Sequence, residues 1–244
     1  MSHSEIGLIA IRPPEYFPRP ELFALMMAVD VFVLADTFQY SRQSFQNRTR
    51  VRTPDGWQWL SVPLEGGQHG RPIAEVRVAD GGGRWKSRHW RSLEYNYRSS
   101  PFFEYYEDTI ARVVGGGSRR LGEVTVASML AVRDILEIET RVVVASAMDE
   151  VPVSPAEVAR HFPGAAIATL PDAEDADLQA SLILDYQVAR YPQNFDRFES
   201  GMSILDLLFN VGPDVRRMLG GGRLRESARG KTRKVRTVDD HADL

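Results

Sequence analysis

The N-terminal forty residues constrain the fold more than any other part of the chain. An apolar run, Ile6–Ile11, is followed by a turn that contains Pro13, Pro14 and Pro18, where neither helix nor strand can continue. Pro20–Val29 then has the composition of a helix, with proline in its first turn. Val31–Leu34 is a second short apolar run. Strand, turn, helix and strand in this order predict a βαβ unit with parallel strands.

The rest of the chain continues the alternation of strands and helices. Val51–Pro63 predicts an antiparallel hairpin, because Pro54-Asp55-Gly56 supplies residues suited to a tight turn. Further strands are expected at Ile73–Ala79, Arg141–Ala145, Ala165–Leu170 and Leu182–Val188. Helices are expected at Trp85–Tyr97, Pro101–Val114, Leu121–Ile138 and, after a capping box at Ser154-Pro155-Ala156-Glu157, up to Phe162. The sequence therefore predicts an α/β fold: a mostly parallel, Rossmann-like sheet with flanking helices and an inserted antiparallel hairpin region.

A short helix is also predicted near the C-terminus, at Ser203–Gly212. Ser203 and Asp206 have the spacing of a capping box, in which each side chain bonds the other residue's backbone N–H. Asp206 and Asn210 lie four residues apart and share one helix face. The capping box explains Asp206 without any function. For Asn210, a structural role and a functional role are equally expected.

Composition limits the class of protein. The 244 residues carry a formal charge of −3, contain no cysteine and include no apolar run near 18 residues. Disulfides, cysteine-bound metals and a membrane span are therefore not expected. The N-terminus lacks the pattern of a signal peptide, so we expect a cytoplasmic protein. From Arg223 onward, seven basic and four acidic residues follow a glycine run. We expect one domain over residues 1–222 and a flexible basic tail over 223–244, solvated or bound to anionic lipid or nucleic acid.

Five motifs occur in the same order as in a known bacterial family. The first comprises Pro14, Tyr16, Pro18, Asp30, Val31, Asp36, Gln39 and Tyr40; the second is Ser44-Phe45-Gln46-Asn47-Arg48 with Val51; the third is Trp59-Leu60-Ser61-Val62-Pro63; the fourth joins His89, Leu93 and Tyr97 to Pro101-Phe102-Phe103; the last is the run from Ser203 to Gly212. Together they resemble the WbqC-like family over about Ile6 to Gly212. Pro13 and Arg19 stand where the family pattern has glutamine and tryptophan.

Candidate ligand-binding residues follow the predicted strands, because open parallel sheets bind ligands at the carboxyl ends of their strands. The turn after the first strand offers Pro14 and Tyr16, and Asp36 with Gln39 follows the second. Asn47, Arg48 and Arg50 offer paired guanidinium groups to an anion. Arg48 and Arg50 could equally be one solvated strand face, and Asp36 could cap a turn.

His89 is the candidate general acid or base, since the unperturbed pKa of histidine is about 6.5. Tyr97 lies two helical turns further on and can face the same cleft. The alternative is a partly buried structural histidine. We predict Asp36, His89 and Asn210 as catalytic residues that converge on one cleft, with Asp206 and Tyr97 among the binding residues. No histidine spacing suits a metal, and no glycine run has the spacing of a phosphate loop.

The resemblance implies a role in bacterial cell-surface polysaccharide biosynthesis, including O-antigen. It favours a transferase that moves an acyl, aminoacyl or glycosyl group to an amino sugar or similar acceptor. A nucleotidyltransferase-like enzyme is an alternative, although the His-x-Gly-His motif of such enzymes is absent. A non-catalytic scaffold of a biosynthetic complex is another. The expected partner is a small nucleotide-activated or anionic substrate rather than nucleic acid, and neither a cofactor nor an oligomeric state is indicated.

Overall fold

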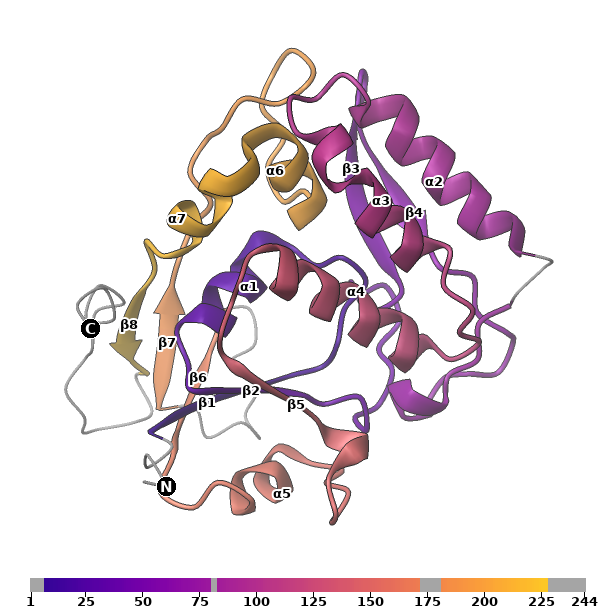
Figure 1. Ribbon diagram of the computed structural model, residues 1–244. Coiled ribbons are helices and arrows are strands. Elements are labelled where there is room, and N and C mark those ends of the chain that lie inside the picture. Colours follow the sequence, from indigo (N-terminus) through magenta and orange to yellow (C-terminus); the bar gives the residue numbers. More distant parts are fainter. Residues whose placement is uncertain (1–6, 80–82, 172–180, 228–244) are drawn as a thin grey trace.

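A six-stranded sheet is the centre of the computed structural model, which describes residues 7–79, 83–171 and 181–227 (Figure 1). Its strands are β1 (Leu8–Arg12), β2 (Val31–Leu34), β5 (Arg141–Val144), β6 (Ala166–Thr169), β7 (Leu182–Asp185) and β8 (Arg223–Glu226). They lie in the order β5-β2-β1-β6-β7-β8, and only β8 is antiparallel to its neighbour. The predicted parallel pairing of β1 with β2 is confirmed, with Ile9 opposite Val31. The α/β fold class is confirmed with it.

Helices cover both faces of this sheet, which explains why its central strands are apolar throughout. One face packs against α1 (Pro20–Met27), α4 (Leu121–Ile135), α6 (Ile204–Val211) and α7 (Val215–Leu219). On the strands, Ala10, Phe32 and Leu34 contribute to this larger core. The other face carries Ile9, Ile11 and Val33 and packs against the short helix α5 (Pro155–Arg160). Half of the predicted capping box forms there: Ser154 Oγ accepts the N–H of Glu157, but the Glu157 carboxylate accepts the N–H of Val153.

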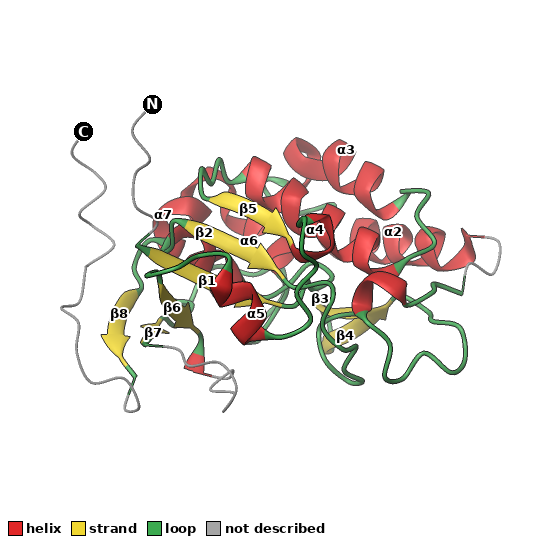
Figure 2. Ribbon diagram, turned by 90° about the horizontal axis from the view of Figure 1, so that it is seen from below, coloured by secondary structure: helices red, strands yellow, loops and turns green. Residues whose placement is uncertain are grey.

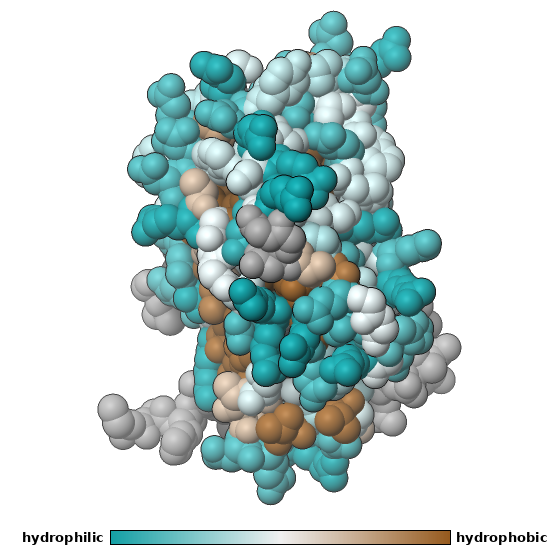
Figure 3. Space-filling model, turned by 90° about the vertical axis from the view of Figure 1, so that its right-hand side faces the viewer, coloured by the Kyte–Doolittle hydropathy of each residue, from teal (hydrophilic) through white to brown (hydrophobic). Residues whose placement is uncertain are grey.

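The predicted hairpin forms a separate two-stranded sheet of β3 (Arg48–Thr53) and β4 (Gly56–Ser61) beside the main sheet (Figure 2). Helix α2 (Arg84–Tyr97) packs on the hairpin face that carries Val51 and Leu60, and α3 (Phe103–Val114) packs on α2. Figure 3 shows the side of the molecule to which α2 belongs as mostly hydrophilic, with hydrophobic residues gathered in its lower half.

The strand predicted at Ile73–Ala79 is wrong. Ile73–Glu75 is a single turn of 3₁₀ helix, followed by isolated bridges from Arg77 and Val78. The buried residues Ile73 and Val76 are three apart, a spacing that suits a helical turn better than a strand. Helix α4 packs closely against this turn at Gly122, where a Cβ would lie 2.8 Å from the Cα of Ala74.

The tail predicted from Arg223 begins instead as an ordered strand. Arg223–Glu226 pair with β7, and Leu224 is buried in the larger core. The burial of Leu224 explains why this segment is ordered. Without β8, β7 would also present an exposed edge, and an exposed edge strand readily pairs with another segment. Residues 228–244 of the predicted tail lie outside the described residues. Within the described residues, no helix is long and apolar enough to span a membrane.

Candidate functional site

The proline-rich turn after β1 lies inside the molecule rather than at an open site. Pro14 is buried, and Tyr16 and Phe17 are almost completely buried. The carbonyl of Phe17, a residue with φ of 41°, accepts hydrogen bonds from Thr49 Oγ1 at 2.7 Å and Ser203 Oγ at 2.9 Å. Its N–H donates to Ser128 Oγ at 3.2 Å. The turn therefore joins β3, α4 and the start of α6. We call this meeting point, together with the hydrogen bonds around His89 and Asp206 described next, the buried junction.

His89 completes this junction. Its Nε2 lies 3.1 Å from the carbonyl oxygen of Ser61, which can only accept, so Nε2 carries the proton. Nδ1 then accepts from the hydroxyl of Tyr16, also at 3.1 Å. Burial lowers the pKa of His89 to about 4. The imidazole is thus uncharged at neutral pH and both its nitrogens are engaged, which favours positioning over the predicted role as a base.

Asp206 is the second centre of buried hydrogen bonds, and the predicted capping box does not form around it. Ser203 Oγ accepts the N–H of Leu205, while the N–H of Ser203 donates to the carbonyl of Arg50. The fully buried carboxylate of Asp206 instead accepts from Tyr97 at 2.8 Å, Tyr191 at 2.5 Å and Gln193 at 2.8 Å. Burial raises the pKa of Asp206, and these three donors oppose the rise.

Two asparagines and Gln39 have local roles. The side-chain nitrogen of Asn210 donates to the carbonyl of Asp206 at 2.8 Å, one turn earlier in α6. Asn47 accepts from the hydroxyl of Tyr40 and donates to the carbonyl of Val62, both at 3.0 Å. Gln39 is exposed, and its backbone bridges to Pro72. These contacts account for both asparagines without a ligand.

Asp36 lies at the carboxyl edge of the main sheet, as predicted. Its carboxylate accepts the N–H of Ser146 at 2.9 Å and the Ser146 hydroxyl at 2.6 Å, which joins the ends of β2 and β5. Among the contacts of the described residues, none links Asp36, His89 and Asn210. Their partners are three separate sets, so the predicted convergence on one cleft gains no support and stays a prediction.

Arg48 and Arg50 lie on the outer face of the hairpin, opposite the face that carries Thr49 and meets the proline-rich turn. The guanidinium of Arg48 stacks 4.1 Å from the ring centre of Trp59 and donates to the carbonyls of Ser44 and Gln43. That of Arg50 stacks 3.7 Å from the ring centre of Trp57. Both side chains are half-buried, so neither belongs to a freely solvated strand face.

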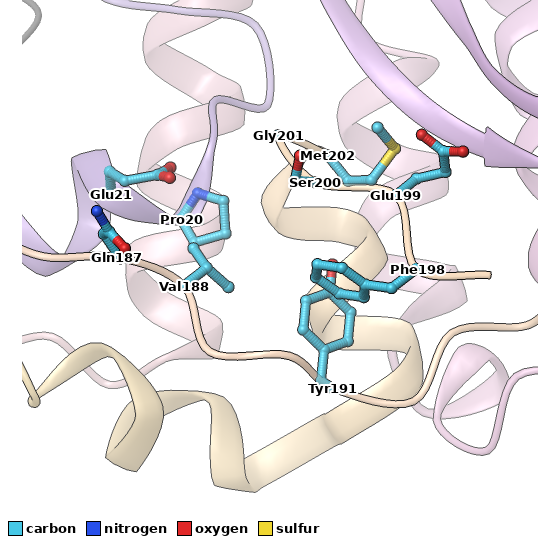
Figure 4. Close-up of a pocket in the computed structure, with 10 residues that line it drawn as sticks. All are labelled: Pro20, Glu21, Gln187, Val188, Tyr191, Phe198, Glu199, Ser200, Gly201 and Met202. Atoms are coloured by element: carbon cyan, nitrogen blue, oxygen red, sulfur yellow. The ribbon is translucent and has the colours of Figure 1, made fainter.

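A cavity of about 230 Å³ lies where three segments meet (Figure 4). Pro20 and Glu21 come from the first turn of α1, Gln187 and Val188 follow β7, and residues 198–202 precede α6. Figure 4 shows Pro20 and Glu21 on one side of the cavity and the aromatic rings of Tyr191 and Phe198 on the other. The cavity is at the carboxyl end of β7, the edge at which open α/β sheets bind ligands.

Two buried polar groups, one of them in the lining of this cavity, have no hydrogen-bond partner. Oε2 of Glu21 is buried and has no hydrogen-bond partner, and the same is true of the hydroxyl of Tyr186, the residue just after β7. Burial, and then the charge of Glu21, raise the pKa of Tyr186 to about 12. The two groups are close enough to interact electrostatically, yet neither has a hydrogen bond that offsets its burial.

Sequence reasoning did not single out Glu21, Tyr186 or Glu199. A glutamate in the first turn of a helix is common and favourable there, so it gives no signal of function. Tyr186 lies within the strand expected at Leu182–Val188, where a tyrosine is common, and Glu199 lies in a segment without a recognisable pattern. Within the described residues, no group of three or more histidine, aspartate or glutamate side chains could hold a metal ion.

Comparison with known proteins identifies the chain. The model of the WbqC-like protein family matches residues 13–218. The protein belongs to the WbqC-like family. A Mycobacterium tuberculosis (strain ATCC 25618 / H37Rv) protein, named "Uncharacterized protein Rv1507c", is 30% identical over 221 residues, which cover 85% of this chain and 95% of that protein. No solved structure matches.

Four of the WbqC-like motif residues belong to the buried junction and not to the cavity lining. Tyr16, His89, Tyr97 and Asp206 are each less than 5% exposed. Tyr191, which precedes the final motif, belongs to both places: its ring lines the cavity and its hydroxyl donates to Asp206. Asp206 of the final motif therefore holds one wall of the cavity through Tyr191.

Proposed function

We propose that this WbqC-like protein is a transferase of bacterial cell-envelope polysaccharide biosynthesis. It moves an acyl, aminoacyl or glycosyl group from a nucleotide-activated or otherwise anionic donor to an amino sugar. The family resemblance supports the pathway, and the cavity beside Glu21 supports the acceptor.

The observation that carries the proposal is the state of Glu21. One of its carboxylate oxygens is buried without a partner beside the cavity, and burying such a group costs about 1–3 kcal/mol in a folded protein. That cost is offset when the Glu21 side chain turns this oxygen towards the cavity and a ligand amine or hydroxyl donates to it.

The walls suit a sugar ring. Tyr191 and Phe198 meet edge to face with ring centres 5.3 Å apart, and they present apolar surface to one side of the cavity. Glu199 adds a second carboxylate to the lining. Small-molecule cavities are usually about 300–1,000 Å³. At about 230 Å³, this one limits its occupant to the size of a single sugar ring.

Glu21 also has the chemistry required for the transfer. The acceptor amine or hydroxyl attacks the electrophilic carbon of the donor, and the Glu21 carboxylate takes the proton that the nucleophile loses. The bond from that carbon to the donor's leaving oxygen breaks, and the leaving group departs with the electron pair. In this proposal Glu21 takes the role of base that the sequence assigns to Asp36 or His89.

A non-catalytic binding or scaffold protein is the second candidate, favoured by the burial of the motif residues. Calorimetry with glucosamine, with and without an activated donor, separates the two. We expect glucosamine to bind, and Glu21→Gln to weaken the binding about tenfold through loss of a charge-assisted hydrogen bond. Glu104→Gln, on the exposed side of α3, is the matched control and should leave binding unchanged.

The possible results divide clearly. Binding that depends on Glu21, together with turnover of a donor, supports the transferase. Binding that depends on Glu21 without turnover of any acyl, aminoacyl or glycosyl donor supports the scaffold. Absence of amino-sugar binding, or equal affinity in Glu21→Gln, contradicts the assignment of the cavity.

A further inference from the structure

The outer face of the hairpin carries an unusual alternation of arginines and aromatic rings. Besides the Arg48–Trp59 and Arg50–Trp57 stacks, Arg19 lies 4.8 Å from the ring centre of Phe45. Phe45 meets Trp59 at 5.2 Å, and Trp59 meets Trp57 at 5.7 Å, both edge to face. We call these six residues the arginine–aromatic face: Arg19, Phe45, Arg48, Arg50, Trp57 and Trp59.

Positive charge is concentrated on this face. Burial is the main cause that lowers the pKa of Arg50; the charge of Glu199 opposes it, and the nearby charge of Arg19 lowers the pKa further. The Nε of Arg50 is buried without a hydrogen-bond partner. Like charges that repel one another are stabilised by a bound anion, and guanidinium groups suit phosphate in particular.

Trp57 adds a stacking surface next to the charges. It is 41% exposed, although Arg50 stacks on its ring and Trp59 meets it edge to face. The exposed part of the ring therefore lies away from both neighbours. Stacking of a nucleic-acid base on an exposed aromatic ring is a general mode of recognition that depends little on which base is bound.

The arginine–aromatic face adjoins the cavity. Nη1 of Arg50 lies 3.1 Å from the position that a Cβ would take on Gly201, which lines the cavity and has φ of +69°. Glu199, whose charge acts on Arg50, lines it as well. Arg19 directly precedes Pro20, another lining residue. A ligand held by these arginines therefore lies beside an occupant of the cavity.

We propose that the arginine–aromatic face binds the nucleotide portion of the activated donor, with the base on Trp57 and the phosphate on Arg48 and Arg50. This inference rests on the proposed function, which supplies the acceptor in the cavity. The leaving oxygen of the transfer is then a phosphate oxygen. It takes the electron pair of the broken carbon–oxygen bond and remains held by the arginines, while the acceptor's proton goes to Glu21.

Tryptophan fluorescence and calorimetry test this assignment with UDP and AMP as probes. We expect both nucleotides to bind and to quench fluorescence. Pyrophosphate should bind without quenching and uridine should bind weakly. Trp57→Ala should weaken nucleotide binding about tenfold, whereas Trp57→Phe keeps a stacking ring and should cost less than about threefold. Arg48→Ala should weaken UDP and pyrophosphate alike, and Arg91→Ala, on the exposed side of α2, should affect neither.

Four outcomes overturn the assignment: no nucleotide binding, equal losses in the two Trp57 variants, equal UDP affinity in Arg48→Ala, or binding only of a single-stranded RNA 20-mer. Failure here is distinguishable from failure of the proposed function. If glucosamine binds in a Glu21-dependent way but nucleotides do not, only the donor site is wrong. If nucleotides bind but glucosamine does not, only the acceptor cavity is wrong.

Discussion

The buried junction and the cavity beside Glu21 differ in whether their buried polar groups have hydrogen-bond partners. In the junction, the carboxylate of Asp206 accepts three hydrogen bonds and both nitrogens of His89 are engaged. In the cavity lining, Oε2 of Glu21 has no partner. Stable folding favours the first arrangement, whereas groups left unsatisfied at a cost are typical of sites that bind. The difference indicates that the junction maintains the fold and the cavity binds the substrate.

Removing Asp206 should give the largest loss of stability. In Asp206→Ala, the buried donors of Tyr97, Tyr191 and Gln193 lose their acceptor, so we expect the free energy of unfolding to fall by about 3–5 kcal/mol. Urea denaturation measures this. Asp108→Ala, at an exposed position of α3, is the control and should change stability by less than about 0.5 kcal/mol. Equal effects would remove the distinction between junction and surface.

His89 should make the protein less stable in acid. The folded-state pKa of about 4 lies below the ordinary value of about 6.5, so the unfolded chain binds a proton first as pH falls. Its contribution is complete above pH 6.5 and is lost towards pH 4, by about 3 kcal/mol in total. The raised pKa of Asp206 acts in the opposite sense but is common to both proteins when wild type is compared with His89→Gln. The free energies of unfolding of wild type and His89→Gln, measured from pH 7 to pH 4, should therefore converge in acid. A difference between the two proteins that stays constant with pH would contradict a buried neutral imidazole.

Tyr16→Phe tests the same junction with a smaller change. It removes only the hydroxyl that donates to Nδ1 of His89 and leaves that buried acceptor without a partner. We expect a loss of about 1–2 kcal/mol in the free energy of unfolding. In the His89→Gln background the same substitution should cost clearly less. Additive effects of the two changes would show that the hydrogen bond contributes little.

Glu21→Gln should have the smallest effect on stability, within about 1 kcal/mol of wild type or slightly stabilising. The folded protein gains nothing from a buried carboxylate oxygen without a partner, so loss of the charge costs little. Thermal unfolding measures this, with Glu199→Gln as a second cavity variant. A loss as large as that of Asp206→Ala would place Glu21 in the folding core instead.

Much of the fold could be predicted from the sequence because apolar periodicity dictates it. The β1–α1–β2 unit and the hairpin follow from runs of apolar residues and proline or glycine at the turns. The strand predicted at Ile73–Ala79 is wrong for a different reason. In so short a segment, apolar residues at every third position, as in a 3₁₀ turn, cannot be told from apolar residues at every second position, as in a strand. Asp206 could be recognised as structural, but its true partners, Tyr97 and Tyr191, are distant in sequence and no local pattern reveals them.

The cavity could not be predicted for a related reason. Its lining comes from the start of α1, the segment after β7 and the loop before α6, which only the folded chain brings together. The significance of Glu21 lies in a missing hydrogen bond, and a sequence contains no record of that.

NMR titration of the ¹⁵N-labelled protein with glucosamine tests the central claim most directly. We predict that amide shifts change at Glu21, Val188, Gly201 and Met202, around the cavity, and that these changes disappear in Glu21→Gln. Amides at Asp36 and Ser146, at the other end of the same sheet edge, should not move. Shifts centred on Asp36 and Ser146, or no shifts at the cavity at saturating glucosamine, would contradict the account.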